Sequence, residues 1–244
     1  MQAIMMAAGK GSRMGELTVG EPKSFAEIKG IKLIEYNLRL LKHYGIEEII
    51  IVTGYCCEAF EKLTKDMKHV RLIYNPFYEM TNVLGSFFMG MEALRDDFIY
   101  LHGDTICEPA IFEKLVCMEP DMDVVLPVDY GPCDEEAMKV KTIQGRVVKI
   151  TKEMDTAGAD GEFIGMAAFR RETIPALKAK TKELLKAKEF QDYFESAIQK
   201  LIDEENYRIE AVSTEGAFWA EIDFVQDYEK AAANIPESLT RLCL

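Results

Sequence analysis

Short apolar runs alternate with amphipathic stretches along the first half of the chain. The apolar runs are hydrophobic at nearly every position, which is typical of strands that are covered on both faces of a sheet. The stretches between them carry apolar side chains at helical spacing. The pattern predicts strands at 3–8, 48–53, 70–74 and 98–101 and helices at 35–44, 58–67 and 82–94. It therefore predicts an α/β, Rossmann-like fold with a mostly parallel sheet flanked by helices.

The pattern changes after Pro127. Gln144 and Gly145 separate two short alternating segments and predict a β-hairpin. The second half predicts strands at 140–143, 146–150, 207–212 and 218–222 and helices at 172–188, 193–204 and 225–234. We interpret these elements as a small lid and substrate-binding subregion added to the same domain. We expect one domain over 1–244, with two functional halves at 1–127 and 128–244.

Composition narrows the classes of function. Of the 244 residues, 48% are hydrophobic, which suffices for a core without disulfides or a structural metal. The formal net charge is −13, and an acidic surface repels the nucleic-acid backbone, so we expect no nucleic-acid partner. Local basic residues can still hold a single nucleotide. The six cysteines form no C-x-x-C pair and predict free thiols at Cys56, Cys57, Cys107, Cys117, Cys133 and Cys243.

The amino-terminal segment MQAIMMAAG has neither a basic leader nor a long apolar core, so it does not read as a signal peptide. No apolar run approaches the roughly 20 residues that span a bilayer. We therefore expect a cytoplasmic protein with no membrane insertion.

A glycine-rich loop follows the first predicted strand and reads Ala7-Ala8-Gly9-Lys10-Gly11-Ser12-Arg13-Met14. Its glycines let backbone N–H groups approach phosphate oxygens, while Arg13 and the later Lys23 supply positive charge. The P-loop pattern is absent, and Met14 stands where the dinucleotide-binding fingerprint needs its third glycine. An ordinary strand-to-helix turn is the alternative to a phosphate-binding loop.

The whole string A-A-G-x-G-x-R-M, followed by Pro22-Lys23, resembles the signature of the sugar-nucleotide pyrophosphorylase and cytidylyltransferase superfamily. The resemblance implies a GT-A-like nucleotidyltransferase fold. It also implies that Arg13 and Lys23 take part in catalysis. The nucleotide-binding residues that it implies are Ala7, Ala8, Gly9, Lys10, Gly11, Ser12, Arg13, Lys23, Asn82, Ser86 and Gly103.

Two carboxylates are candidates for binding Mg²⁺. Asp104 follows the strand at 98–101, and Asp223 stands just before the last predicted helix. The resemblance implies that they hold the catalytic metal, although a turn at Asp104 and a helix N-cap at Asp223 are the structural alternatives. Related glycosyltransferases usually carry a D-x-D motif here, and the sequence Gly103-Asp104-Thr105-Ile106 lacks it.

Within the superfamily the chain looks most similar to bacterial phosphocholine cytidylyltransferases and related CTP-dependent enzymes that act on phospho- and phosphono-alcohols. The similarity lies in three stretches, at 75–82, 82–86 and 221–228. The amide of Asn82 can donate to and accept from a cytosine edge. Its alternative is a helix N-cap before Val83, and the two roles are compatible.

The acceptor side is less defined by the sequence. The resemblance implies that Lys152 grips the acceptor phosphate and that Gly165 permits close backbone approach, with Lys141 a weaker candidate. An amine-bearing acceptor would be held by aromatic and acidic side chains. The candidates are Tyr130, Phe163, Tyr193, Phe194, Trp219, Asp129, Asp192, Glu195 and Glu162. The alternative is that the aromatic residues are core and that Lys152 is a solvated strand end.

The expected reaction is transfer of CMP from CTP to a small phosphorylated or phosphonylated amine-bearing acceptor, with Mg²⁺ and release of pyrophosphate. One alternative is a sugar-1-phosphate nucleotidyltransferase that uses UTP, dTTP or GTP. A second is a catalytically silent nucleotide-sensing subunit on the same fold, which the intact Arg13, Lys23, Asp104 and Asp223 argue against. The sequence leaves the oligomeric state open, a homodimer included.

Overall fold

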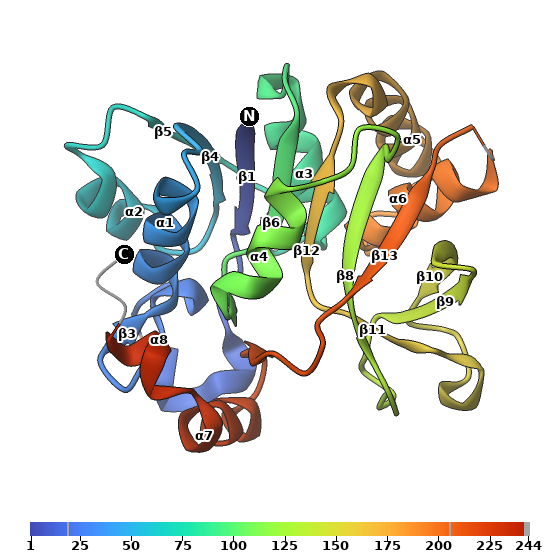
Figure 1. Cartoon of the computed structure of the whole chain (residues 1–244). Helices are drawn as coiled ribbons and strands as arrows, with labels where there is room; N and C mark the ends of the chain where they lie inside the picture. Colours follow the sequence, from blue (N-terminus) through green and yellow to red (C-terminus); the bar gives the residue numbers. More distant parts are fainter. Residues whose placement is uncertain (19, 205, 242–244) are drawn as a thin grey trace.

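The computed structural model describes residues 1–18, 20–204 and 206–241, and one ten-stranded sheet runs through both halves of the chain (Figure 1). The first half supplies parallel strands in the order β6-β1-β4-β5. Their bounds are Gln2–Ala7 for β1, Glu48–Thr53 for β4, Val70–Tyr74 for β5 and Phe98–His102 for β6. These strands agree with the predicted ranges to within one residue. The α/β class is confirmed.

The second half of the sheet is mainly antiparallel, so the prediction of a mostly parallel sheet holds for the first half alone. Here β8 and β13 run parallel, while β12 lies antiparallel to both β6 and β8. The predicted hairpin is β9 and β10, joined through Gln144 and Gly145 with positive φ angles of 51° and 85°. The strands are β8 (Val124–Tyr130), β9 (Lys139–Ile143), β10 (Arg146–Thr151), β11 (Gly161–Phe163), β12 (Met166–Phe169) and β13 (Ile209–Ser213).

Helices cover both faces of the sheet. Alternate residues of β1 point to opposite sides, so Ala3 and Met5 join one core cluster while Ile4 and Met6 join the other. On the first face lie α1 (Leu33–His43), α2 (Cys57–Thr64), α4 (Pro109–Val116), α7 (Val225–Asn234) and α8 (Glu237–Arg241). On the second face lie α3 (Val83–Gly90), α5 (Ile174–Lys186) and α6 (Phe194–Asp203). Figure 1 shows α7 and α8 near the carboxyl end of β1.

Two small pairings outside the main sheet matter for the site. Strand β7 (Thr105–Cys107) continues directly from the turn after β6 and pairs antiparallel with β14 (Trp219–Glu221). The ladder places Glu221 opposite Thr105, and the backbone N–H of Ile222 donates to the carbonyl of Asp104 at 3.2 Å. Strands β2 (Glu27–Ile28) and β3 (Ile31–Lys32) form a separate hairpin before α1.

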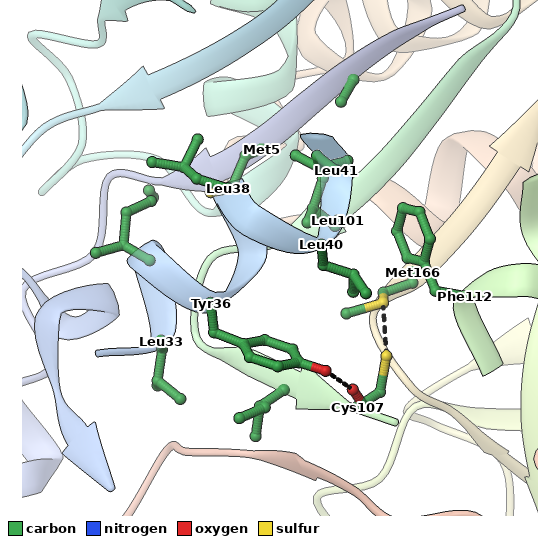
Figure 2. Packing of buried hydrophobic residues seen from close by; sticks show 14 of the residues in the cluster. Met5, Leu33, Tyr36, Leu38, Leu40, Leu41, Leu101, Cys107, Phe112 and Met166 are labelled. Carbon is green, nitrogen blue, oxygen red and sulfur yellow. Dashed lines mark hydrogen bonds between the residues drawn. The ribbon is translucent and has the colours of Figure 1, made fainter. Parts of the chain in front are cut away.

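Helix α1 is hydrogen-bonded to the backbone of β7. Figure 2 shows Tyr36 reaching from the helix to Cys107, whose carbonyl accepts the Tyr36 hydroxyl at 2.5 Å. The neighbouring Asn37 donates its side-chain amide to the carbonyl of Thr105 at 2.9 Å. Both residues are buried, so these bonds satisfy carbonyls that the short β7–β14 ladder leaves open. The segment that follows Asp104 is thereby held against the core.

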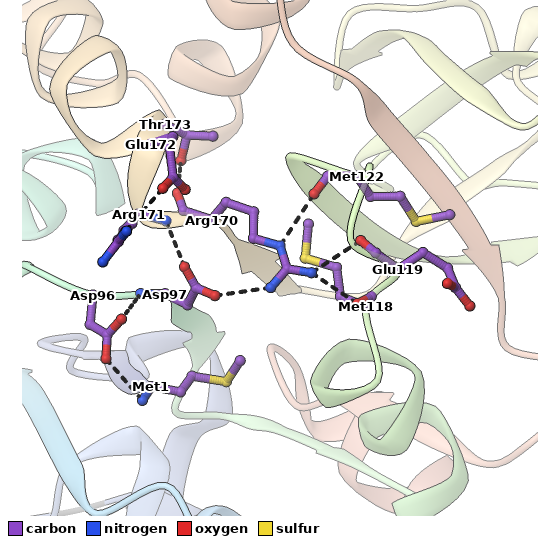
Figure 3. A network of polar contacts seen from close by, with 10 residues as sticks. All are labelled: Met1, Asp96, Asp97, Met118, Glu119, Met122, Arg170, Arg171, Glu172 and Thr173. Atoms are coloured by element: carbon purple, nitrogen blue, oxygen red, sulfur yellow. Dashed lines mark hydrogen bonds and ion pairs between the residues drawn. The ribbon is translucent and has the colours of Figure 1, made fainter.

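Arg170, just after β12, ties the two halves together at the opposite end of the sheet. Figure 3 shows its guanidinium between Asp97, which precedes β6, and the loop between α4 and β8. It donates to Asp97 at 3.0 Å and to the carbonyls of Met118 and Glu119 at 2.9 and 3.0 Å. A half-buried guanidinium that donates to several acceptors keeps its orientation, so it anchors β12 between β6 and β8.

The five cysteines within the described residues are free, and Cys243 lies outside the described residues. No helix in the described part of the chain combines the length and the apolar surface that crossing a bilayer requires.

Candidate active site

A cleft of about 990 Å³ lies at the carboxyl ends of β1 and β6 and is lined by residues from both halves of the chain. This is the edge where parallel α/β sheets bind ligands. The glycine-rich loop forms one wall, and residues from β8, β11, α6 and the segment just after β10 contribute to the other. Most of the residues predicted to bind nucleotide or acceptor line this one cavity.

The loop after β1 is folded tightly over Lys23. Gly11 has a φ of 68°, and a Cβ atom added there would lie 3.0 Å from Cγ of Lys23, so glycine is required by both conformation and space. Ala8, Gly9, Lys10, Gly11, Ser12 and Arg13 all line the cleft. The Arg13 guanidinium lies over the ring of Phe224, 4.7 Å from its centroid. The loop thus lines the cavity closely and brings an oriented guanidinium to it.

Two residues predicted to bind nucleotide, Ala7 and Gly103, lie behind the cleft wall. Strand alternation turns the side chain of Ala7 into the core cluster with Ala3 and Met5. Gly103 packs beneath β1, where an added Cβ atom would come within 3.0 Å of the Ala7 side chain. In this structure the small size of Ala7 and Gly103 lets β1 and the turn after β6 pack closely together.

Lys23 lies between the two predicted metal-binding aspartates and forms close ion pairs with both Asp104 and Asp223. The pairing of β7 with β14 explains this geometry, because it brings residues far apart in sequence to one point. Burial alone would lower the pKa of Lys23, but the carboxylates of Asp104, Asp223 and Glu221 outweigh it and hold the pKa above its usual value. Lys23 is therefore a charged residue.

His102 and Glu221 complete this centre, and sequence reasoning missed both. His102 Nδ1 lies 2.7 Å from a Glu221 oxygen, and its Nε2 lies 2.9 Å from the hydroxyl of Tyr100. Burial disfavours the charged imidazole, yet Glu221 raises the pKa of His102 to about 9. Gly165 makes room for the ring, because an added Cβ atom would lie 2.7 Å from His102 Nδ1. A usable signal was the i, i+2 spacing of Glu221 and Asp223, which favours one face of a strand.

The donor set fits a divalent cation. Ligand atoms of His102, Asp104 and Glu221 all lie within 4.8 Å of one another, and Asp223 reaches the same ammonium as Asp104. Burial is the largest cause of the raised pKa of Asp104, and repulsion from Glu221 and Asp223 adds to it against the attraction of Lys23. Crowded carboxylate oxygens with too few cations are the environment that Mg²⁺ prefers.

Helix α3 contributes the wall near the predicted nucleobase position. The side-chain oxygen of Asn82 accepts from the backbone N–H of Val83 at 2.8 Å. The side-chain NH₂ of Asn82 donates to the backbone carbonyl of Gln191 at 3.2 Å. The N-cap role is therefore present in the structure, and Asn82 also lines the cleft. Ser86 lines it too, and its hydroxyl accepts from Asn75 at 3.1 Å. Tyr78 and Thr81, which sequence reasoning missed, lie on the same wall.

The opposite wall carries most of the residues predicted to bind the acceptor. Asp129 accepts from the Thr214 hydroxyl at 2.7 Å and from the indole N–H of Trp219 at 3.0 Å, so both of its oxygens are engaged. Lys152 lies over the ring of Tyr193, 4.8 Å from its centroid. Burial raises the pKa of Glu162 to about 7, with repulsion from Asp134 adding to it.

A buried lysine that sequence reasoning missed supports this wall. Lys139 is fully buried, and its ammonium donates to the carbonyls of Glu135 and Lys152 at 2.9 and 2.8 Å. It thereby fixes the backbone that presents Lys152 to the cleft.

Several weaker acceptor candidates lie elsewhere. Phe194 is fully buried and stacks on Tyr100 with ring centroids 3.9 Å apart, so it is a core residue. Phe163 is 2% exposed, although it borders the cleft. Lys141 pairs with Asp160 at 2.7 Å and stabilises the β9 region. The remaining candidates, Tyr130 and Asp192, are not among the described residues that line the cleft.

A sequence profile of the MobA-like NTP transferase domain matches residues 3–195. The chain belongs to this family. The matched range contains the glycine-rich loop, Lys23 and Asp104, and it ends before Glu221 and Asp223. As a MobA-like NTP transferase, the chain is an enzyme of the nucleotidyltransferase class.

Curated relatives extend over nearly the whole chain. The chain is 28% identical over 252 residues to the CTP:phosphoglutamine cytidylyltransferase of Campylobacter jejuni, covering 94% of this chain and 98% of that protein. It is 28% identical over 231 residues to the choline-phosphate cytidylyltransferase of Streptococcus pneumoniae, covering 94% and 96%.

Solved structures agree with the fold of this transferase. The CTP:phosphocholine cytidylyltransferase of Streptococcus pneumoniae superposes with a TM-score of 0.80 at 25% identity, covering 96% of this chain and 99% of that one. The inositol-1-phosphate CTP transferase of T. maritima superposes with a TM-score of 0.77 at 23% identity, covering 96% of each chain. The second likeness, at this identity, supports the shared fold alone.

Proposed function

We propose that this NTP transferase is a Mg²⁺-dependent cytidylyltransferase that moves CMP from CTP to a small phosphorylated or phosphonylated molecule bearing an amine, with release of pyrophosphate. One observation carries the proposal. A single cleft joins a glycine-rich loop, a carboxylate centre around Lys23 and an acidic wall with one lysine. The cytidylyltransferase activities named for the two bacterial relatives support the choice of CTP.

The loop at 8–13 binds the triphosphate in this proposal. Its residues line the cleft, where backbone N–H groups could bind phosphate oxygens, and Arg13 packs on the ring of Phe224, so its guanidinium can bind the departing β- and γ-phosphates. Preorganised donors of this kind stabilise charge without having to reorient during the reaction. Asn82 and Ser86 lie where a cytosine edge would meet polar groups.

Asp104 and Asp223 would hold the magnesium ion. A bound Mg²⁺ supplies positive charge that offsets the charge on the two phosphates as they approach. Lys23, which already contacts both aspartates, provides a second cation at the same point. His102 bonds Glu221 and fixes the side chain that stands beside them.

The acceptor binds against the second half of the chain. Lys152 is the cation of that wall and is suited to the acceptor phosphate, while Asp129, Glu162 and the aromatic Tyr193 and Trp219 surround the remainder of the molecule. An oxygen of the acceptor phosphate or phosphonate forms a bond to the α-phosphorus of CTP. The bond from that phosphorus to the bridging oxygen breaks, and both of its electrons leave with pyrophosphate. No general base is needed, because the attacking phosphate is already an anion.

We also propose that the chain acts as one domain, with residues 1–127 binding CTP and residues 128–244 binding the acceptor. The main sheet runs through both parts, which supports a rigid relation between the two substrates. A homodimer remains a prediction from sequence.

The test is pyrophosphate release measured with Mg²⁺ across CTP, UTP, dTTP, GTP and ATP. Each nucleotide is paired with phosphoethanolamine, phosphocholine, 2-aminoethylphosphonate and glucose 1-phosphate. We expect release with CTP and an amine-bearing acceptor. Release with glucose 1-phosphate and UTP or dTTP would assign the enzyme to the sugar branch instead. Nucleotide binding without release in any pair would favour a sensing subunit.

A further inference from the structure

One buried carboxylate oxygen of a residue that lines the cleft has no hydrogen-bond partner among the described residues. Glu195, near the start of α6, is 2% exposed and lines the cavity. Its Oε2 atom makes no hydrogen bond to any residue that the structure describes. Its other oxygen lies 3.8 Å from His102 Nε2, and that nitrogen is already bonded to the hydroxyl of Tyr100. A buried oxygen left unpaired costs free energy unless a ligand supplies a donor.

The neighbouring acids differ from Glu195 in this respect. Both oxygens of Asp129 accept hydrogen bonds, and Glu221 is bonded to His102. The Glu162 carboxyl group lines the same cavity as Glu195 and makes no hydrogen bond or ion pair to the described residues. The acidic wall therefore offers side-chain acceptors at two places.

The wall offers little open aromatic surface. The face of Tyr193 is covered by the Lys152 ammonium, 4.8 Å from the ring centroid. Phe163 is 2% exposed, whereas Trp219 donates its indole N–H to Asp129 and keeps an open ring face. A quaternary ammonium has no N–H and is bound chiefly by a cage of open aromatic faces. This wall presents mainly hydrogen-bond acceptors instead.

We infer that the acceptor carries a primary or secondary ammonium group and that this group donates an N–H to Oε2 of Glu195, with the carboxyl group of Glu162 lining the same cavity. Glu195 is then the residue that selects N–H-bearing acceptors over quaternary ones. The inference rests on the proposed function, because it places the acceptor in the cleft beside CTP. It restricts the proposed acceptors to amine-bearing molecules whose ammonium group has an N–H to donate.

The first experiment uses the unaltered protein and an acceptor series that loses N–H groups one at a time. Phosphoethanolamine, its N-methyl and N,N-dimethyl derivatives and phosphocholine are compared in kcat/KM for CTP-dependent pyrophosphate release. One N–H suffices for Oε2, so the decisive step is the last methylation. We expect kcat/KM to fall roughly tenfold or more there, because the carboxylate oxygen is left unpaired. Equal or higher kcat/KM with phosphocholine would overturn the inference.

The second experiment uses Glu195→Met, which keeps a side chain of similar length and removes both acceptor oxygens. We expect the drop at the last methylation to shrink to about twofold or less, with the KM for CTP unchanged. Glu189→Met, at an exposed position outside the cleft, is the matched control and should keep the full drop. A folded Glu195→Met protein that keeps the full discrimination would also overturn the assignment.

Binding separates this inference from the proposed function. Calorimetry on the protein saturated with Mg²⁺ and a non-hydrolysable CTP analogue should show phosphoethanolamine binding more tightly than phosphocholine. If the analogue binds and neither acceptor does, the inference fails while nucleotide binding stands. If the analogue itself does not bind, the proposed function fails.

Discussion

Lys23 is the one ammonium that faces three carboxylates at the centre of the site, namely those of Asp104, Glu221 and Asp223. Its side chain is 11% exposed, so removing its charge would leave the carboxylates with little water to screen their repulsion. The same position explains why a divalent cation is compatible with the site. A bound divalent cation and the Lys23 ammonium would both offset the negative charge of these three carboxylates.

We predict that Lys23→Met lowers the free energy of unfolding by about 3 kcal/mol in magnesium-free buffer, because it removes one partner of a buried ion cluster. Millimolar Mg²⁺ should restore part of this loss in the variant and have a smaller effect on the unaltered protein. Urea unfolding with and without Mg²⁺ measures both quantities. A variant as stable as the parent protein without Mg²⁺ would contradict the account of the centre.

Asp104→Asn separates catalysis from stability. The pKa of Asp104 is raised by burial and by neighbouring carboxylates, so a neutral amide relieves crowding. We expect the melting temperature to be unchanged or higher. Activity should fall by on the order of a thousandfold, because the substitution removes a proposed Mg²⁺ ligand whose contribution is several kcal/mol. The exposed Asp66→Asn is the control and should match the parent protein in both measurements.

His102 and Glu221 set a pH window for stability. The pKa of His102 is raised from 6.5 to about 9, so its contribution is complete below about pH 6.5 and is lost as the pH rises through 9. The pKa of Glu221 is lowered to about 2 from 4.5, so its contribution is complete above about pH 4.5 and is lost as the pH falls toward 2. Together they stabilise the fold most between about pH 4.5 and 6.5.

His102→Gln should lower the free energy of unfolding at pH 6 by about 2 kcal/mol, and the gap to the parent protein should narrow between pH 7 and 9. The exposed His69→Gln serves as the control and should show no such gap. Urea titrations at each pH provide the test. A gap that stays constant from pH 6 to 9 would show that the pair does not titrate as described.

At the scale of elements, the turn between β11 and β12 shapes the site through Gly165. Its φ of 78° favours glycine, and an added Cβ atom would push against His102. We predict that Gly165→Ala destabilises the protein by about 2 kcal/mol and reduces activity, because His102 must move away from Glu221. Gly158→Ala is the matched control, since its Cβ atom would meet the nearest atom, in Met154, at an ordinary 3.7 Å. Equal effects of the two substitutions would contradict this reading.

Elements with a strong local pattern could be predicted from the sequence. The β-branched and mostly apolar β4 and β5 and the amphipathic α7 begin and end at the predicted residues. Strand β8 could not be predicted, because Pro127 lies within it and proline ordinarily argues against a central strand. The short β7, β11 and β12 exist through their pairing partners, so no local pattern indicates them.

The site follows the same division. Arg13, Lys23, Asp104 and Asp223 were recognisable from motif strings, and the structure brings all four to one cleft. Glu195 was predicted as a candidate for acceptor binding, whereas His102 and Glu221 were missed, because their contacts depend on packing between β6 and β14. Beyond the spacing of Glu221 and Asp223, long-range pairing of this kind leaves no signal in a single sequence.

At the scale of the whole molecule, the proposed transfer reaction requires that both substrates occupy the cleft together. The halves share one sheet, so CTP at the glycine-rich loop and an acceptor at Lys152 would lie in a fixed relation. Proximity of this kind is a principal source of rate in a reaction between two bound molecules.

The most direct measurement is ³¹P NMR of the protein with CTP, Mg²⁺ and phosphoethanolamine. The account predicts that a CDP-linked product and pyrophosphate appear together in equal amounts, that both need Mg²⁺, and that UTP does not replace CTP. Pyrophosphate accompanied by CMP alone, or the same product yield with UTP, would contradict the claim that this chain transfers CMP to an amine-bearing acceptor.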